Sequence, residues 1–500
     1  MHEAEPRTFN RKRLVFILCV GLLILLPVFV KLTFYPAYPG SDDAFIHLAV
    51  AEHILDGHGW GVVSNDRVNL SSSPLFTVLL LPILAIGSVG LAQAFSLVFA
   101  SAALAVTYFT MRAMMSSEVS GLAALVVAAA NVHLWRWSGT VMESSLAYLA
   151  VTAIAATTLW IMRSKRESTW HFLVLGILVG LGTEVRFEIG LFLPLTCIAL
   201  WFSGGQYRTR LLAIIVGFCV SFAPWLGFAT AYFGSPLPTT FLAKTTGFHF
   251  VNLTITKQLG AVVISGFGLS ILLAVVAVVI AISSGDGRSR LRSYALPLMF
   301  LMAWPIALFA FYYFKTPYLQ SAARYYLPGM ATWPFAFGLV VSSIPALALH
   351  RYRFAATSAL AACLAVGMVI NMLTISPVLT MFNSGYRSAM DEGAAYLRAH
   401  CRQGDVALIY VDIGIMAHDG IGDCSLKDGG ALATPSLRGM ELEQEIAAVH
   451  PTYLIQSIGQ QRDEWSAEYP GLKLLLSRAY ADRGVERTGQ EGYLNIYAVQ

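Results

Sequence analysis

Two adjacent carboxylates, Asp42 and Asp43, are the residues of this sequence best placed to do chemistry. They follow a Pro39-Gly40 turn and begin an expected helix, with Ser41 at the N-cap position. A helix N-terminus stabilises carboxylate anions. Such a carboxylate could deprotonate a hydroxyl group or hold a divalent cation, Mg²⁺, Mn²⁺ or Ca²⁺, beside a phosphate. The alternative is that both acids only cap a solvated helix.

Other polar residues of the same stretch favour a functional interpretation. His47 lies four residues after Asp43, so the two side chains could share one face of the helix. The alternative is a surface histidine. Arg67 adds a cation shortly before the next apolar segment. A loop this polar between membrane elements is expected to do more than connect them.

Three ionisable residues, Glu143, Arg186 and Glu188, lie in or beside apolar segments. Such residues are costly in a bilayer and tend to face a cavity or one another. They therefore indicate a site within the membrane body. An ion pair between Glu184 and Arg186 that only stabilises the fold is the alternative.

Two further loops place cations on the same expected face. The loop 234–244 carries Lys244, and a later one carries Lys315, Arg324 and Tyr325. They oppose the tendency of Lys and Arg to lie on the cytoplasmic side. A lipid-linked phosphate would need cations of this kind, although each side chain could instead snorkel to the interface.

The elements that must position these residues are membrane helices. Of the 500 residues, 56% are hydrophobic and 12% are charged, which excludes an ordinary soluble enzyme. The net charge of +4 comes mostly from short basic clusters between apolar runs, so we expect no nucleic-acid partner. The basic start and the apolar run 14–34 favour a retained first helix over a cleaved signal peptide, because the run approaches the roughly 20 residues of a span.

The pattern of apolar segments predicts about eleven spans. They lie at about 14–34, 91–112, 119–136, 140–162, 170–185, 187–203, 211–233, 261–283, 294–314, 326–347 and 354–375. Basic clusters fall on alternate loops, which predicts a cytoplasmic N-terminus and places the loops 35–73, 235–260 and 315–325 outside. The apolar segment 74–90 would break this alternation as a span, so we expect it to be interfacial or re-entrant.

A change in composition near residue 383 predicts two domains. Residues 1–382 would form the polytopic α-helical membrane domain, and residues 383–500 a soluble extracytoplasmic α/β domain. Helices are predicted at 388–399 and 442–449, and strands at 405–411, 452–456 and 493–499. Cys401 and Cys424 could form a disulfide there or remain two thiols.

The first outer loop resembles that of the polytopic C-type (GT-C) glycosyltransferases that use polyprenyl-phosphate sugars, especially the arabinofuranosyltransferase-like branch. The matching segments are, in order, Asp42-Asp43-Ala44-Phe45-Ile46, Gly57-His58-Gly59, Asp66-Arg67-Val68, Ser73-Pro74-Leu75-Phe76, 139–144 with Glu143, Arg186-Phe187-Glu188-Ile189-Gly190, 237–244 with Lys244, Arg324-Tyr325 and Asp412-Ile413-Gly414. No single motif is specific for this family, but the occurrence of the motifs in this order is. The stretch 69–72 and the missing proline between Arg186 and Glu188 depart from the branch, which leaves the sugar open.

The resemblance implies a bacterial cytoplasmic-membrane enzyme. It would transfer a monosaccharide, arabinofuranose-like in this branch, from a polyprenyl-phosphate donor to an envelope glycan or lipid acceptor on the outer face, among membrane lipids. Asp42 or Asp43 would be the catalytic base or a metal ligand. The donor phosphate would bind Lys244, Arg186 and Arg324. The residues that would position cations or the sugar are Glu143, Glu188, His47, Arg67 and Tyr325.

Two other functions fit the same residues. A transporter or lipid-glycan flippase could use Glu143, Arg186 and Glu188 along a translocation path. The absence of an inverted repeat in the sequence speaks against it. A non-catalytic scaffold of an envelope complex is the third interpretation.

Overall fold

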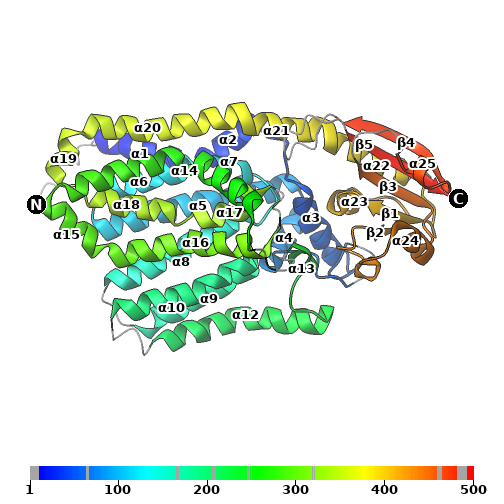
Figure 1. Ribbon diagram of the computed structural model, residues 1–500, viewed down its shortest axis with the longest axis horizontal. Coiled ribbons are helices and arrows are strands. Elements are labelled where there is room, and N and C mark those ends of the chain that lie inside the picture. The colour runs from blue at the N-terminus through cyan, green and yellow to red at the C-terminus, as the bar shows by residue number, and fades with distance from the viewer. Residues whose placement is uncertain are drawn as a thin grey trace, which may run out of the picture.

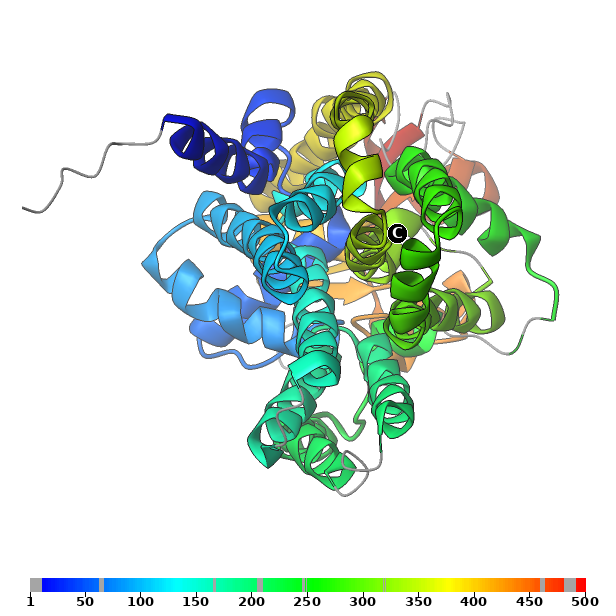
Figure 2. The same cartoon turned by 90° about the vertical axis from the view of Figure 1, so that its left-hand side faces the viewer.

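The computed structural model describes residues 11–62, 67–164, 168–204, 210–244, 248, 250–317, 319, 321–458, 464–480 and 492–500. Most of these residues form helices that run along the long axis of the molecule, and a small sheet domain lies at one end (Figure 1). Figure 2 shows the helical part from the end opposite the sheet, with many of its helices seen nearly end-on.

Among the described residues, six helices are long and apolar enough to cross a bilayer, or up to eight spans if each of two bent helix pairs counts as one. The six are α5 (Val89–Met115), α8 (Ser144–Ser164), α12 (Leu211–Phe233), α14 (Leu253–Ile282), α16 (Ala295–Lys315) and a long helix over Phe354–His400. The bent pairs are α1 (Arg11–Ile24) with α2 (Leu26–Phe34), and α6 (Glu118–Ala129) with α7 (Val132–Ser138).

The predicted count of about eleven spans is not confirmed, although the predicted segments are largely helical. The segments 170–185 and 187–203 form α9 (Thr169–Val185) and η1 (Phe187–Leu191) with α10 (Phe192–Ser203). They are shorter than the roughly 20 residues that a span needs. The segment 326–347 is divided between α17 (Ala322–Met330) and α18 (Trp333–Ser342).

The apolar segment that was expected to be interfacial or re-entrant forms α4 (Pro74–Ile86). Its 13 residues are too few to cross a bilayer core of about 30 Å. It packs against α3 (Asp42–Leu55) and α9. The remaining helices of this part are α13 (Thr239–Lys244), α15 (Gly285–Ser293) and α19 (Ala346–Arg351).

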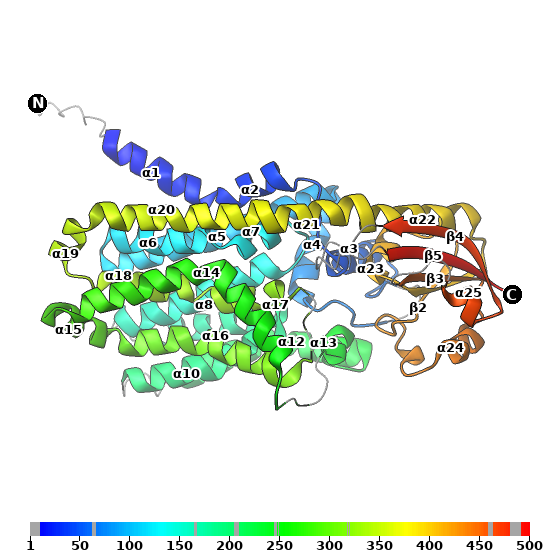
Figure 3. The same cartoon turned by 45° about the horizontal axis from the view of Figure 1, so that its top comes forward.

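One helix joins the bundle to the sheet domain. It consists of α20 (Arg353–Ile370), the π-helical turn η2 (Asn371–Ile375), α21 (Ser376–Met381), the π-helical turn η3 (Phe382–Arg387) and α22 (Ser388–His400). Figure 3 shows it running along the bundle and onward to the strands. The change in composition at residue 383 therefore falls within a continuous helix and is not marked by a break in the backbone.

The C-terminal part is an α/β domain with a five-stranded mixed sheet in the order β2-β1-β3-β5-β4. β1 pairs in parallel with β2 and β3, and β5 pairs antiparallel with β3 and β4. Its elements are β1 (Val406–Tyr410), α23 (Ile413–Asp419), β2 (Ser425–Asp428), η4 (Pro435–Leu437), α24 (Leu442–Val449), β3 (Tyr453–Ile458), α25 (Glu464–Glu468), β4 (Leu472–Tyr480) and β5 (Gly492–Val499). All five predicted elements of this part are present. The elements that were not predicted are β2, α23, η4, α25 and the edge strand β4.

The helix α3 lies at the junction between the bundle and the sheet domain (Figure 1). Its residues 44–51 are buried, and one hydrophobic core continues from the bundle through α3 to α23 and one face of the sheet. A Cβ at Gly414 of α23 would lie 2.5 Å from the backbone nitrogen of Ile46, so only glycine permits this approach. The alternative of a solvated capping helix is therefore wrong.

A disulfide links Cys401, at the end of α22, to Cys424, before β2. The sequence left open whether these two cysteines form a disulfide or remain thiols, and the structure contains the disulfide. Cys19, Cys197, Cys219 and Cys363 are free thiols in the helical part.

We predict that Cys401→Ser lowers the free energy of unfolding of the C-terminal domain by about 3 kcal/mol, because the closed loop of about 23 residues no longer restricts the unfolded chain. Denaturant unfolding of the purified protein measures this, with the exposed Cys219→Ser as the control. Labelling of the unreduced, denatured wild type with maleimide should modify four of the six cysteines. Modification of all six without reductant would contradict the pairing.

Candidate active site

The turn before α3 fixes the direction from which its first residues enter the site. Gly40 has φ +138°, and a Cβ there would lie 2.5 Å from the Cβ of Ala44, so the turn requires glycine. Ser41 occupies the predicted N-cap position, but its side chain makes no capping hydrogen bond. Its Oγ instead accepts a hydrogen bond from Nη1 of Arg324 at 3.3 Å.

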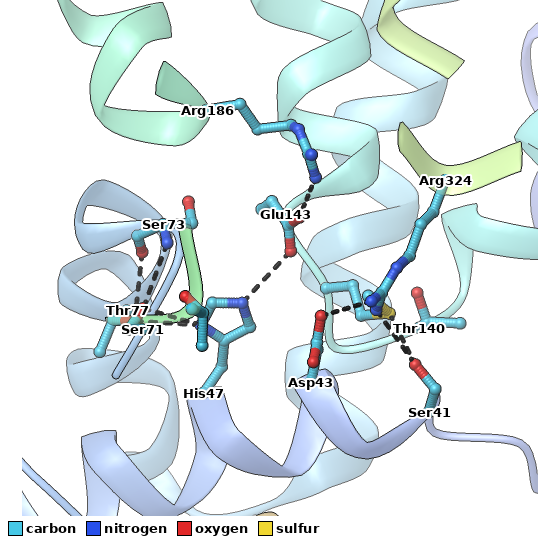
Figure 4. Close-up of polar contacts among 12 residues, drawn as sticks. Ser41, Asp43, His47, Ser71, Ser73, Thr77, Thr140, Glu143, Arg186 and Arg324 are labelled. Atoms are coloured by element: carbon cyan, nitrogen blue, oxygen red, sulfur yellow. Dashed lines mark hydrogen bonds and ion pairs between the residues drawn. The ribbon is translucent and has the colours of Figure 1, made fainter. Parts of the chain in front are cut away.

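Asp43 forms an ion pair with Arg324 from α17, with Oδ2 and Nη2 2.6 Å apart (Figure 4). The Arg324 side chain is 6% exposed and that of Asp43 21%. The same guanidinium donates to the hydroxyl of Tyr325 at 2.6 Å. The structure thus brings Asp43 together with Arg324 and Tyr325, two predicted site residues that follow it by 281 and 282 positions in the chain.

A second ionic cluster surrounds Arg186, between α9 and η1. Its Nη1 lies 2.6 Å from Oε1 of Glu143, and its Nη2 lies 2.6 Å from Oε1 of Glu188. The hydroxyl of Tyr312 in α16 accepts from Nη2 and donates to Glu188. All four side chains are buried. Arg186 therefore pairs with Glu143 and Glu188, rather than with Glu184 as the alternative proposed.

His47 connects α3 to this cluster. It is 1% exposed, and its Nε2 lies 3.2 Å from Oε2 of Glu143 (Figure 4). Its Nδ1 lies 3.1 Å from Oγ of Ser71 and 3.2 Å from Oγ1 of Thr77. The surface-histidine alternative is therefore wrong, and His47 holds Glu143 in position.

Asp42 points to a different partner from its neighbour Asp43. Its Oδ1 accepts a hydrogen bond from the amide of Ile415 at 3.1 Å, at the start of α23 in the sheet domain. Burial raises the pKa of the Asp42 carboxyl well above its usual range, and the nearby Asp412 and Asp43 carboxylates raise it further. The amides of Ile415 and Gly414 act in the opposite direction. The two adjacent acids therefore have separate structural roles.

Two predicted site residues are not shown at the cluster. Arg67 is exposed and lies over the ring of Tyr232, with its Cζ 4.8 Å from the ring centroid. This places it beside the aromatic end of α12, so its predicted role in positioning the substrate has no support from the contacts. Lys244 ends α13, but its side chain lies outside the described part of the chain, as does Asp66.

The predicted divalent cation has no preformed site in the described ranges, which contain no group of three or more His, Cys, Asp and Glu side chains suited to a metal. Asp43 is engaged with Arg324, and Asp42 with backbone amides.

Sequence reasoning missed four residues that complete the site. Tyr312 is one of many aromatic residues in an apolar helix, and Ser71 and Thr77 lie in an inconspicuous serine-rich stretch. Their only sequence signal was polarity close to a predicted site residue. Asp412 was noted only as part of the similarity of the tail.

Two cavities meet at Asp43. The smaller, of about 40 Å³, is lined by residues of the Arg186 cluster and by Phe241. The larger, of about 330 Å³, is lined by Arg324 and by residues of the sheet domain, and we call it the junction cavity. The residues that line both are Asp43, Thr240, Leu319 and Tyr325. Arg186 lies in the wall of the smaller cavity and Arg324 in the wall of the junction cavity. The carboxylate of Asp43, between the two cavities, can therefore take part in a reaction between a group bound in one cavity and a group bound in the other.

We predict that Arg186→Met lowers the free energy of unfolding by about 3–5 kcal/mol, because it leaves Glu143 and Glu188 buried without a cation. Arg112→Met is the matched control. Arg112 pairs with Glu118, both side chains are 47% exposed, and such pairs contribute about 0–1 kcal/mol. Thermal unfolding in detergent measures the stability of both variants. An equal loss of stability in the two would contradict the prediction that the Arg186 cluster stabilises the fold.

Comparisons with known proteins bear on the fold. No protein-family model and no curated protein sequence matches the chain. ArnT from Cupriavidus metallidurans, solved bound to undecaprenyl phosphate, is 11% identical with a TM-score of 0.64, and the match covers 97% of this chain and 98% of that chain. The oligosaccharyltransferase AglB from Archaeoglobus fulgidus, solved with an inhibitory peptide and a dolichol-phosphate, is 12% identical with a TM-score of 0.57, covering 96% and 74%.

A third neighbour is the arabinofuranosyltransferase AftD from Mycobacteria, which is 14% identical with a TM-score of 0.55. That match covers 98% of this chain and 41% of AftD. All three structural neighbours are GT-C glycosyltransferases, in agreement with the resemblance of the motifs. The chain therefore has the fold of the GT-C glycosyltransferases.

Proposed function

We propose that this protein is a glycosyltransferase that moves a monosaccharide from a polyprenyl-phosphate donor to an envelope glycan or lipid acceptor. The observation that carries the proposal is the position of Asp43, between the Arg186 cluster on one side and the junction cavity on the other. The polyprenyl phosphates bound to ArnT and AglB, which have the same fold, support this donor class.

In this reaction the oxygen of an acceptor hydroxyl forms a bond to the anomeric carbon of the donor sugar. The bond from that carbon to the phosphate oxygen breaks, and its electron pair leaves with the phosphate. The hydroxyl proton moves to the carboxylate of Asp43, which acts as general base. The products are a glycoside and a polyprenyl phosphate.

Arg186 is our candidate for binding the donor phosphate, because it lines the smaller cavity together with Asp43. Fixed cations stabilise the charge that develops on a leaving phosphate. Glu143 and Glu188 orient Arg186 but also offset its charge, so a further cation is needed. Lys244 can provide it, since it ends the helix whose Thr240 and Phe241 line the same cavity.

Arg324 was expected to bind the phosphate as well, and we now assign it a different role. It pairs with Asp43 and lines the junction cavity. We infer that it orients the base, with Tyr325 as its partner. Asp42 is a positioning residue, because its carboxyl holds α23 against the start of α3.

We place the protein in a bacterial cytoplasmic membrane, with the N-terminus in the cytoplasm and the sheet domain outside. The disulfide of the sheet domain supports this orientation, because disulfides persist in oxidising compartments. The motifs suggest an arabinofuranose-like sugar as the candidate. This choice is supported by the structural neighbour AftD, which is an arabinofuranosyltransferase.

The experiment that tests the function uses the purified chain in liposomes with radiolabelled polyprenyl-phosphate pentoses and hexoses and an envelope glycan acceptor. A transferase yields labelled glycan and free polyprenyl phosphate. The rival flippase would move the label across the bilayer without releasing polyprenyl phosphate, and that result would overturn the proposal.

We predict that Asp43→Asn lowers the transfer rate by about 10²-fold or more, because the base is lost while the side chain keeps its shape. Asp42→Asn is the matched control on the adjacent residue. Its amide oxygen can still accept from Ile415, so we expect a rate within a few-fold of wild type. Steady-state assays with saturating donor measure the transfer rates of both variants. Full activity of Asp43→Asn would contradict the assignment of Asp43 as the general base.

Asp42→Asn should also change the pH dependence of stability. The folded-state pKa of Asp42 lies above its usual value, so its contribution to stability is present at low pH and is lost as the pH rises through that pKa. The free energy of unfolding of Asp42→Asn should therefore fall less than that of wild type as the pH rises, as denaturant titrations at a series of pH values would measure. An identical pH dependence would contradict the raised pKa.

A further inference from the structure

A cation without a carboxylate partner lies in the helical part of the chain. Arg136 is in the last turn of α7, and it forms neither an ion pair nor a hydrogen bond with any described residue. Its Nε is buried, and its Cζ lies 4.8 Å from the ring centroid of the adjacent Trp137. The side chain as a whole is partly exposed, so a ligand can reach it. Because burial of an unpaired charge is costly, Arg136 is suited to bind an anion.

The surroundings of Arg136 add positive charge and an unused hydroxyl. The titratable groups that act on the Arg136 charge are Tyr35, Tyr38 and Arg324, none of which is a carboxylate. The two guanidinium groups repel each other. Tyr35 is 3% exposed, and its buried hydroxyl has no hydrogen-bond partner among the described residues. An anion beside Arg136 would offset the repulsion, and it can accept a hydrogen bond from this hydroxyl.

Lys31 of α2 adds a third cation to the same region. It is 3% exposed, and its Nζ donates to the backbone carbonyl oxygens of residues 35 and 38. Its stem packs against the chain after α7, since a Cβ at Gly139 would lie 2.4 Å from its Cδ. Of these three cations, only Arg324 forms an ion pair within the described ranges, and its partner is Asp43. The region therefore carries a net positive charge.

We call Lys31, Tyr35 and Arg136 the α2–α7 cluster. It lies where α2 packs against α7, on the side of the bundle away from α12 (Figures 1 and 2). No described lining residue of the smaller cavity or the junction cavity belongs to α2 or α7. The cluster is therefore separate from both cavities of the candidate active site.

The outer face of α2 beside the cluster is apolar. Phe29 and Leu32 are 59% and 64% exposed. Exposed apolar side chains of this kind on a membrane protein indicate contact with lipid. The helix α2 ends shortly before α3, which lies at the junction with the sheet domain (Figure 1). The cluster thus lies at the end of the bundle where the headgroups of the leaflet next to the sheet domain are expected.

We propose that the α2–α7 cluster binds the phosphate of an anionic phospholipid in this leaflet. A guanidinium can donate two parallel hydrogen bonds to phosphate oxygens, and the Tyr35 hydroxyl donates another. Lys31 adds charge while it holds the turn that carries Tyr35, and the acyl chains lie along the apolar face of α2. The cluster favours an anionic lipid over a zwitterionic one, whose headgroup cation it would repel. The site does not depend on the proposed function.

The test measures lipid binding by native mass spectrometry of the purified chain, titrated with phosphatidylglycerol in detergent. We expect one tightly bound molecule in the wild type. Arg136→Gln should raise the Kd of this molecule about 10-fold, because a charged hydrogen bond to the phosphate is lost. Binding with the wild-type Kd by Arg136→Gln would overturn the proposal.

Arg67→Gln is the matched control, because it removes the same charge from an exposed arginine in the loop between α3 and α4. The Cζ of Arg67 also lies 4.8 Å from the centroid of an aromatic ring, that of Tyr232. We expect a Kd within about 2-fold of wild type, because exposed charges contribute little. An equal loss in both variants would show general attraction to a positive surface and would overturn the site.

Two other probes identify the source of the phosphate. Phosphatidylcholine with the same acyl chains should bind about 10-fold more weakly than phosphatidylglycerol, because its headgroup cation is repelled. Inorganic phosphate should not displace phosphatidylglycerol, since it lacks the apolar chains. Equal binding of the two lipids would overturn the role of the cations, and displacement by inorganic phosphate would overturn the assignment to a lipid.

Thermal unfolding separates loss of the site from loss of the fold. Without added lipid, Arg136→Gln should be at least as stable as the wild type, because it removes an unpaired buried charge. Phosphatidylglycerol should raise the Tm of the wild type more than that of the variant. If Arg136→Gln does not fold, Tyr35→Phe replaces it. That variant should unfold as the wild type does without lipid but bind phosphatidylglycerol several-fold more weakly, and wild-type binding would then overturn the proposal.

Discussion

The pairing of Arg186 with Glu143 and Glu188 is the constraint on which the membrane side of the site depends. Three charges are buried there, and an unpaired buried charge costs several kcal/mol. The end of α9, the turn η1, the start of α8 and Tyr312 of α16 must therefore meet at one point. Through His47, the same constraint extends to α3 and the loop before α4. The position of Asp43 is thus determined largely by ionic contacts made elsewhere.

A second constraint acts from the opposite side of α3. Asp42 accepts an amide hydrogen bond from the sheet domain, and Gly414 permits the backbones of α23 and α3 to approach closely. The helix with the two aspartates is consequently held between the bundle and the sheet. The sheet domain is therefore part of the wall around Asp43, although the change in composition near residue 383 predicted a separate soluble domain.

The sequence predicted more of the site than of its surroundings. Glu143, Arg186 and Glu188 could be singled out because charges in apolar segments must find partners. Asp43 was indicated by the pair of acids at a helix N-terminus, and Arg324 by its place in a loop on the outer side. The roles of Asp42 and Asp43 could not be separated, since adjacent residues of a helix point about 100° apart and only the surroundings decide what each meets. The number of spans was not predictable from hydropathy alone, because α9 and α10 are apolar but short. Contacts between distant segments, such as those of Tyr312 and Ile415, leave no local signal.

The continuous helix from Phe354 to His400 has a mechanical consequence. Its 47 residues correspond to about 70 Å, more than twice the roughly 30 Å of a bilayer core. A helix of this kind acts as a ruler between the membrane and the sheet, because it hardly stretches. The carboxylate of Asp43 is then held at a fixed height above the lipid. Under the proposed function, an acceptor glycan must bend down to that height, and chains too short or too stiff to do so would be poor acceptors whatever their sugar.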